Sequence, residues 1–192
     1  MAARPIPHSY DGAQRAFHWI MAALIFLAIA IGVVAALLPE HKSPRVELLF
    51  AHKSLGMTVL VLAVLRLAYR AIAGAPAYAA TLTPWTRASA HAAHIALYAL
   101  MIALPVSGYV NSAAGGHEVP WFGLFVWPSF FPRDKALAHL GGQAHFWLAW
   151  TIGAFLALHL AAAAWHAWVK RDEIFARMWP DRAALAGRGE GG

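Results

Sequence analysis

Four long apolar stretches restrict this chain more than any other feature. They cover residues 16–38, 49–73, 89–112 and 144–169 of the 192-residue sequence. A helix rises about 1.5 Å per residue, so about 20 apolar residues cross the roughly 30 Å hydrocarbon layer of a bilayer. The chain is 60% hydrophobic and 12% charged, whereas soluble domains are about 45–50% apolar and about 25% charged. We therefore expect an all-α integral membrane protein that folds as a four-helix bundle.

The composition excludes several other classes of protein. The apolar residues come in unbroken blocks, which argues against coiled coils, collagen and disorder. The chain has no cysteine, so disulfides, thiolate-held iron–sulfur clusters and cysteine nucleophiles are excluded. A net charge of +6 would suggest nucleic acid for a soluble protein. Here the basic residues flank apolar blocks, where they orient helices in the membrane, so we expect lipid as a partner and no nucleic acid.

The distribution of lysine and arginine predicts the orientation of the helices. The first stretch contains His18 and Trp19 and is too long for a signal peptide, so we expect it to be retained. With both termini in the cytoplasm, ten basic residues lie on that side: Arg4, Arg15, Arg66, Arg70, Arg87, Lys170, Arg171, Arg177, Arg182 and Arg188. Five lie on the other side: Lys42, Arg45, Lys53, Arg133 and Lys135. The positive-inside rule therefore favours two cytoplasmic termini.

The third loop is aromatic and uncharged between residues 119 and 132. It is too short and too often interrupted by proline to span the membrane. We expect it to lie in the outer interface, as an anchor or, alternatively, as a lid over a substrate.

Histidines inside apolar helices are costly, so each one is a functional hypothesis. The fourth stretch carries His145 and His159, 14 residues apart. That spacing corresponds to about 21 Å along the axis and returns to within about 40° of the same direction. His52 lies at the level of His145, and His18 at the level of His159.

Two histidines from facing helices at each of two levels suit two b haems, because a haem iron takes two axial ligands and no cysteine is present to tether the macrocycle. The alternative is that all four are hydrogen-bonded bundle histidines. A zinc site is disfavoured, because it requires three or four ligands at one level.

Other residues fit this interpretation. Arg66 lies 14 residues after His52 and can pair with a haem propionate. Gly32 and Gly56 leave room beside the macrocycles, or alternatively allow close helix packing. His94 and His166 lie near the cytoplasmic level, where they can hydrogen-bond a quinone or simply meet interfacial water.

Five segments are distinctive together: 17–19 (Phe-His-Trp), 51–56 (Ala-His-Lys-Ser-Leu-Gly), 90–94 (Ala-His-Ala-Ala-His), 100–108 and 153–166. Through them the sequence resembles the bacterial cytochrome b561 family over about residues 9–180, which we expect to form one transmembrane di-haem domain followed by a flexible tail at 181–192. The resemblance implies an inner-membrane protein with two b haems. It matches His18, His52, His145 and His159 to the iron ligands, and His94 and His166 to quinone positions.

Two activities are compatible with such a protein. Some members of the family resemble superoxide:ubiquinone oxidoreductases, and in that case Lys53, beside His52, would steer the superoxide anion. Others are electron-carrying subunits that pass electrons between quinol and a periplasmic partner. A haem-free transporter or structural bundle is the alternative from a different class.

Overall fold

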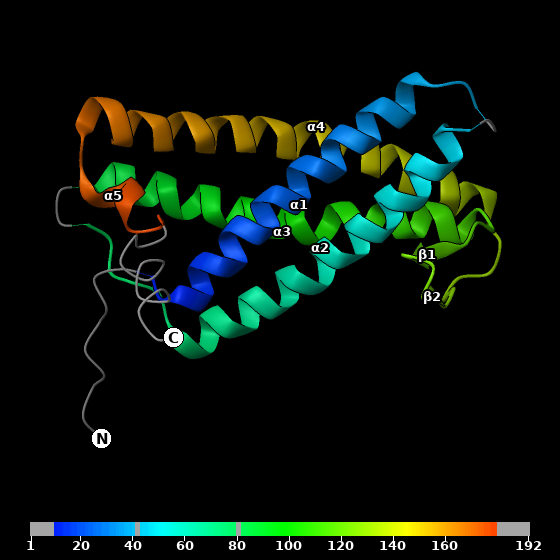
Figure 1. Ribbon diagram of the computed structural model, residues 1–192, viewed down its shortest axis with the longest axis horizontal. Coiled ribbons are helices and arrows are strands. Elements are labelled where there is room, and N and C mark those ends of the chain that lie inside the picture. Colours follow the sequence, from blue (N-terminus) through cyan, green and yellow to red (C-terminus); the bar gives the residue numbers. More distant parts are fainter. Residues whose placement is uncertain (1–9, 41–42, 80–81, 180–192) are drawn as a thin grey trace, which may run out of the picture.

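Four long helices form the protein in the computed structural model, which describes residues 10–40, 43–79 and 82–179 (Figure 1). The long helices are α1 (Gly12–Leu37), α2 (Arg45–Ala73), α3 (Pro84–Ala114) and α4 (Lys135–Ala164). The shorter elements are β1 (Val119–Trp121), β2 (Phe125–Trp127), the π-helix η1 (Trp165–Lys170) and α5 (Glu173–Ala176). The expected four-helix architecture is confirmed. The proposed tail at 181–192 lies outside the described residues.

α1, α3 and α4 begin before the apolar stretches that predicted them, and a polar side chain caps the first turn of each. Asp11 accepts a hydrogen bond from the backbone N–H of Gln14, and Asp134 accepts two from the first turn of α4. These side chains satisfy backbone donors that would otherwise have no partner in the first turn. As a result α4 begins nine residues before the apolar stretch that predicted it.

The four helices are arranged as two antiparallel hairpins, α1 with α2 and α3 with α4, and α2 packs against α3. One end of the bundle holds the α1–α2 connection and the β hairpin, and we call it the hairpin end. The other holds the start of α1, η1 and α5, and we call it the terminal end (Figure 1). There the indole N–H of Trp19 donates to the Met178 carbonyl at 2.9 Å. Both ends of the described chain therefore lie at one end of the bundle.

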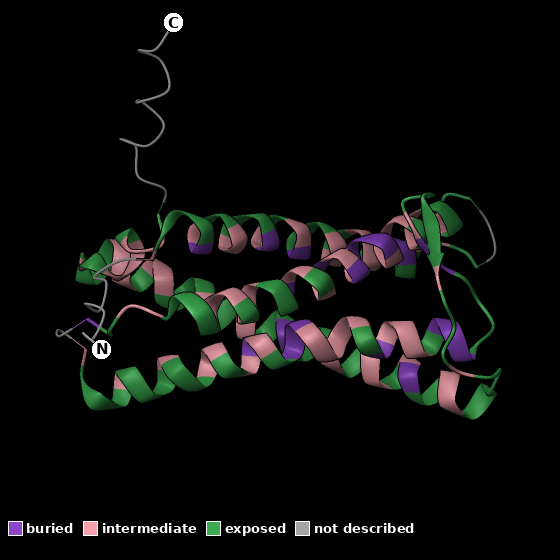
Figure 2. Cartoon of the chain, turned by 90° about the horizontal axis from the view of Figure 1, so that it is seen from below, coloured by how far each residue is buried: buried purple, intermediate pink, exposed green. Residues whose placement is uncertain are grey.

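The bundle is most apolar in its middle. A buried cluster draws on all four helices and is made of Met21, Ile25, Val59, Ala63, Leu97, Leu100, Met101 and Ile152. Outward-facing residues are mostly exposed along all four helices (Figure 2), and all four are long and apolar enough to cross a membrane. Exposed apolar side chains of this kind are expected where helices face lipid.

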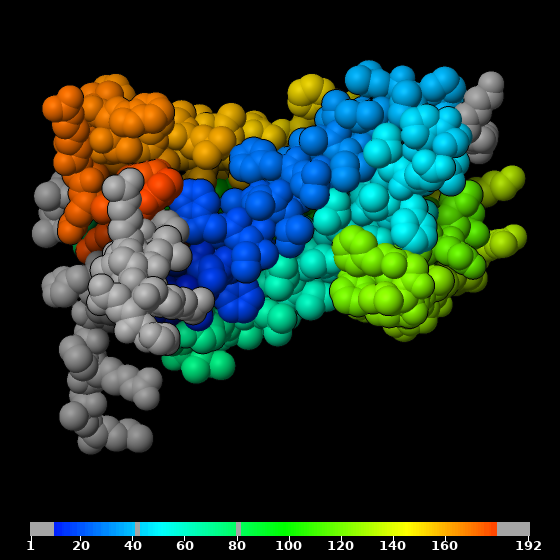
Figure 3. Space-filling model, viewed as in Figure 1, coloured from blue at the N-terminus to red at the C-terminus, as the bar shows by residue number. Residues whose placement is uncertain are grey.

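The aromatic third loop forms an antiparallel β hairpin in which Val119 pairs with Trp127. It packs on the start of α2 (Figure 3). The hydroxyl of buried Ser54 donates to the Pro120 carbonyl at 3.1 Å and accepts from the Phe122 N–H at 3.0 Å. The Trp121 indole donates to Thr58 at 3.0 Å. The loop does not span, as expected, but its two short strands were not predicted.

Candidate functional site

His52 on α2 and His145 on α4 face each other at the hairpin end. Their ring centroids are 6.0 Å apart and the rings are nearly perpendicular, at 89°. The Nδ1 atom of His52 lies 2.9 Å from the Ala28 carbonyl oxygen, and that of His145 lies 2.9 Å from the Leu104 carbonyl oxygen. A carbonyl only accepts, so both rings carry their proton on Nδ1. Each Nε2 therefore keeps a lone pair that can bind a metal ion.

Two glycines bring these rings against the neighbouring helices. A Cβ at Gly32 would lie 2.8 Å from Cε1 of His52, and a Cβ at Gly108 would lie 2.9 Å from Cε1 of His145. In both cases the glycine follows the carbonyl acceptor by four residues, one helical turn later. The space at Gly32, expected to face a macrocycle, is thus taken by the His52 imidazole. At Gly56 no heavy atom lies within 4 Å of a built Cβ.

The spacing of the hairpin-end rings suits one iron between them. Two imidazoles that bind one metal from opposite sides through Nε2, each at about 2.0 Å, have ring centroids roughly 6 Å apart. The described residues contain no group of three or more His, Cys, Asp or Glu side chains that could hold a metal ion. The arrangement therefore fits a haem that His52 and His145 would hold better than a bare metal ion such as zinc.

The terminal end brings three imidazoles together. The ring centroids of His18 and His159 are 6.3 Å apart, which is the pairing expected from the sequence. The ring of His94 on α3 lies 5.8 Å from that of His159. Either neighbour of His159 is close enough to share an iron with it. The structure thus places His94 inside this level of the bundle, nearer the candidate ligands than an interfacial position would require.

Arg66 also lies at the terminal end, as its spacing from His52 predicts. Its Nη2 atom is 3.2 Å from Nδ1 of His18, and its guanidinium carbon lies 5.4 Å from the centre of the Tyr98 ring. A guanidinium only donates hydrogen bonds, so Nδ1 of His18 is the acceptor here. His18 therefore differs from His52 and His145, whose Nδ1 atoms donate.

The apolar cluster separates the two histidine levels. On α4, Ile152 lies midway between His145 and His159, and on α2 the buried Val59 and Ala63 lie between His52 and Arg66. The two candidate sites therefore lie at different levels along the bundle axis, with buried apolar side chains between them.

His166 and Lys53 have partners that the sequence did not indicate. Nδ1 of His166, in the π-helix η1, lies 2.6 Å from a carboxylate oxygen of Asp172. The change from α to π geometry at Trp165 means that His166 does not follow His159 in a regular α-helical register. Nζ of Lys53 donates to the Glu118 backbone carbonyl at 2.9 Å.

The sequence did not reveal four contributors to the site: the carbonyls of Ala28 and Leu104, Gly108, and Asp172. A carbonyl acceptor cannot be recognised in a sequence, because every residue has a backbone carbonyl. Gly108 could have been found as a glycine inside an apolar helix near the level of a candidate ligand. Asp172 could have been found as a carboxylate close in sequence to a candidate histidine.

Comparison with known proteins identifies the family of this chain. The family described as prokaryotic cytochrome b561 matches residues 9–181. The chain is 33% identical over 177 residues to cytochrome b561 homolog 2 of Escherichia coli, covering 90% of this chain and 92% of that protein. It is 27% identical over 174 residues to cytochrome b561 homolog 1 of the same organism, covering 90% and 98%.

A third relative carries a more specific name. The chain is 27% identical over 173 residues to a protein of Yersinia pestis named probable superoxide oxidase CybB, covering 90% of this chain and 97% of that one. Family membership implies haem b, which the paired histidines of both levels suit. The chain belongs to the prokaryotic cytochrome b561 family of membrane cytochromes.

Proposed function

We propose that this protein carries electrons through the bacterial inner membrane on two b haems, oxidising superoxide at the periplasmic face and reducing ubiquinone. The observation that carries the proposal is the pair of histidine sites, with ring spacings of 6.0 Å and 6.3 Å, stacked on either side of the apolar cluster. His52 and His145 would hold one haem and His18 and His159 the other. When bound, haem b supplies reversible one-electron transfer.

Charge supports a cytoplasmic terminal end. In the described part of the chain, seven basic residues lie at the terminal end: Arg15, Arg66, Arg70, Arg87, Lys170, Arg171 and Arg177. Four lie at the hairpin end: Arg45, Lys53, Arg133 and Lys135. The positive-inside rule therefore favours a periplasmic hairpin end, which would expose the His52–His145 level to periplasmic electron donors.

Superoxide suits a haem that two histidines would hold. With both histidines bound to the iron, the donor would give its electron to the haem without binding the metal. The protein then has only to attract an anion. Lys53 adjoins His52, and its ammonium group donates to the backbone carbonyl of Glu118 rather than forming an ion pair with a carboxylate of the described residues. Arg45, in contrast, pairs with Glu40 at 3.6 Å.

The overall reaction balances when two superoxide anions give two electrons and one ubiquinone takes them up with two protons, forming two oxygen molecules and one ubiquinol. The protein then has to deliver protons only to the quinone, because the oxidation of superoxide consumes none. His94 and the His166–Asp172 pair lie at the terminal end and can donate protons to a quinone oxygen there.

Superoxide should reduce the haems faster than it dismutates, and the rate should fall with salt, because exposed charges are screened over about 10 Å at 0.1 M. Lys53→Glu should slow reduction on the order of tenfold, with Lys53→Gln intermediate and Lys170→Glu, at the other end, without effect. Stopped-flow absorbance with a superoxide pulse measures the rate. Failure of superoxide to reduce the wild-type haems would refute the oxidase proposal and leave an electron-carrying subunit for a periplasmic partner.

His94→Ala and His166→Ala should each slow the oxidation of the reduced haems by ubiquinone by tenfold or more, because a positioned general acid is lost. Both variants should keep two haems that superoxide still reduces. His139→Ala, an exposed histidine at the start of α4, is the matched control. Normal quinone reduction in both variants would show that the quinone binds elsewhere.

A further inference from the structure

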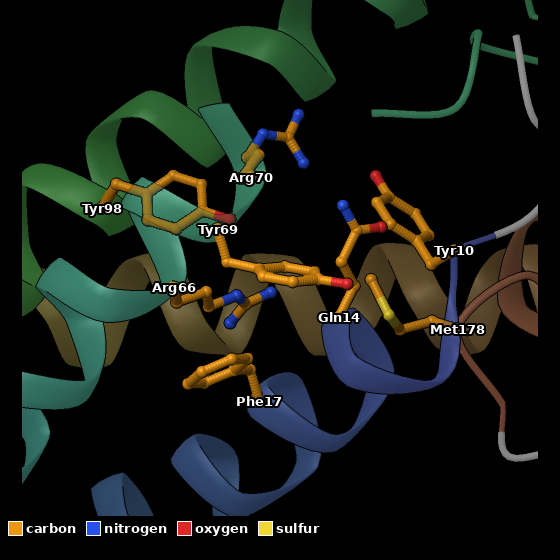
Figure 4. A pocket seen from close by; sticks show the side chains of 8 residues that line it. All are labelled: Tyr10, Gln14, Phe17, Arg66, Tyr69, Arg70, Tyr98 and Met178. Atoms are coloured by element: carbon orange, nitrogen blue, oxygen red, sulfur yellow. The ribbon is translucent and has the colours of Figure 1, made fainter. Parts of the chain in front are cut away.

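Two arginines of α2 line a recess at the terminal end of the bundle (Figure 4). Arg66 and Arg70 are four residues apart, so they lie on one face of the helix. The rings of Tyr69 and Tyr98 lie beside them, and the guanidinium carbons are 5.4 Å and 6.0 Å from the centre of the Tyr98 ring. The recess therefore concentrates two positive charges between helices that cross the membrane.

The described residues do not neutralise these charges. Among the described residues, Glu40, Glu173 and Asp172 pair with Arg45, Arg177 and His166, and no carboxylate lies within ion-pair distance of Arg66 or Arg70. The carboxylate of Asp11 caps α1 and accepts from the Tyr69 hydroxyl at 3.4 Å. Two half-buried guanidiniums that have no counter-ion among the described residues are costly near the hydrocarbon layer. A site of this kind suits an acidic ligand that brings two negative charges.

The contact between Arg66 and His18 indicates which acidic ligand binds in the recess. Nη2 of Arg66 lies 3.2 Å from Nδ1 of His18, and this contact places the imidazole proton on Nε2. A histidine that binds iron through Nε2 must instead carry its proton on Nδ1. Iron binding by His18 therefore ends the hydrogen bond from Arg66, and the released guanidinium needs an acceptor beside His18. The propionate groups of the same haem meet that need.

We infer that Arg66, Arg70 and the Tyr98 hydroxyl form a carboxylate-binding site for the two propionates of the terminal-end haem, and that Arg66 changes partner from His18 to a propionate when this haem binds. The inference rests on the proposed di-haem function and extends it. Haem loading at the terminal end is coupled to an arginine rearrangement. The hairpin-end histidines, already oriented by the carbonyls of Ala28 and Leu104, need no such rearrangement.

The test measures haem loss rather than activity. Purified protein is mixed with excess haem-scavenging apoprotein, and the loss of each haem is followed by its absorption band. Arg66→Gln and Arg70→Gln should each speed loss of the terminal-end haem about tenfold, because a charge-assisted hydrogen bond is lost. The hairpin-end haem should be retained as before, which also shows that the variants fold. Arg70→Lys should recover part of the retention, and Arg87→Gln, exposed at the same end, should match the wild type.

A second arm identifies the acid. Protein made in haem-deficient cells is loaded with haem or with haem dimethyl ester, whose propionates carry no charge. The ester should leave the terminal-end site about as fast from wild type as from Arg66→Gln and Arg70→Gln. If ester and haem are retained equally by wild type while the variants lose bound phospholipid phosphorus, the site holds a lipid phosphate and the inference is wrong. Equal retention of haem by all variants also overturns it, whereas a wild type without a terminal-end haem refutes the di-haem proposal itself.

Discussion

Alanine at any one of the four candidate ligands is expected to remove one haem and leave the other. His52→Ala and His145→Ala should each remove the hairpin-end haem, and His18→Ala and His159→Ala the terminal-end haem. The wild type should hold two haems per chain, both released by acid extraction, because no cysteine is present to bind them covalently. Haem content and the redox titration of the remaining haem measure the outcome.

The separation of the two levels is the physical reason for this pattern. Each pair of rings would hold one haem. The buried apolar cluster, which includes Met21 and Ile152, keeps the bundle folded between the two levels. Removing one imidazole is therefore expected to weaken haem binding at that level only. His139→Ala controls for the loss of an exposed histidine from α4. If His145→Ala and His159→Ala changed the same haem, the assignment of these two residues to different levels would be wrong.

His94 offers a second possible partner for His159 at the terminal end. Its ring is 5.8 Å from that of His159, slightly closer than the 6.3 Å between His18 and His159. We expect His94→Ala to keep both haems, because His18 is the proposed ligand. Loss of the terminal-end haem from His94→Ala, with retention in His18→Ala, would instead make His94 the axial partner and place His18 outside the iron site.

Hydropathy was sufficient to predict the four spanning helices, because each apolar block is long enough to cross a bilayer by itself. The first residues of α1, α3 and α4 depended on polar caps such as Asp134, which hydropathy does not detect. The β hairpin could not be predicted, because its strands have three residues each and are held largely by Ser54 and Thr58 of a distant helix.

Helical periodicity likewise explains which parts of the site were predictable. The 14-residue spacing predicted the two levels and placed Arg66 correctly at the level of His18. Spacing along one helix cannot indicate how far neighbouring helices are rotated, so it left open whether His94 reaches His159. It also gave no sign of the carbonyl acceptors for His52 and His145, because every residue has a carbonyl and only the packing of two helices selects one.

Gly108→Ala and Gly32→Ala should weaken binding of the hairpin-end haem by about ten- to a hundredfold, the usual effect of disturbing a group that orients a metal ligand. A methyl group at Gly108 would lie 2.9 Å from both Nδ1 and Cε1 of His145, and one at Gly32 would lie 2.8 Å from Cε1 of His52. Carbon atoms pack at about 3.5–4.0 Å, so each ring must move away from its neighbouring helix.

Moving the ring also disturbs a hydrogen bond. Nδ1 of each ring lies 2.9 Å from the carbonyl oxygen one turn before the glycine. A ring that gives way loses this bond, which fixes both its direction and the position of its proton. The midpoint potential of any hairpin-end haem that remains should therefore shift as well. The terminal-end haem, at the other level of the bundle, should keep its spectrum and its affinity.

Gly153→Ala is the matched control for these two variants. Gly153 lies on α4 between His145 and His159, is exposed, and has no heavy atom within 4 Å of a built Cβ. Alanine in a helix interior is favoured over glycine by up to about 1 kcal/mol, so this variant should be at least as stable as the wild type and hold two haems. If Gly32→Ala and Gly108→Ala retained the hairpin-end haem as well as Gly153→Ala does, the close approach of the rings to α1 and α3 would not be what orients the ligands. His52 and His145 would then have to be positioned by the haem itself.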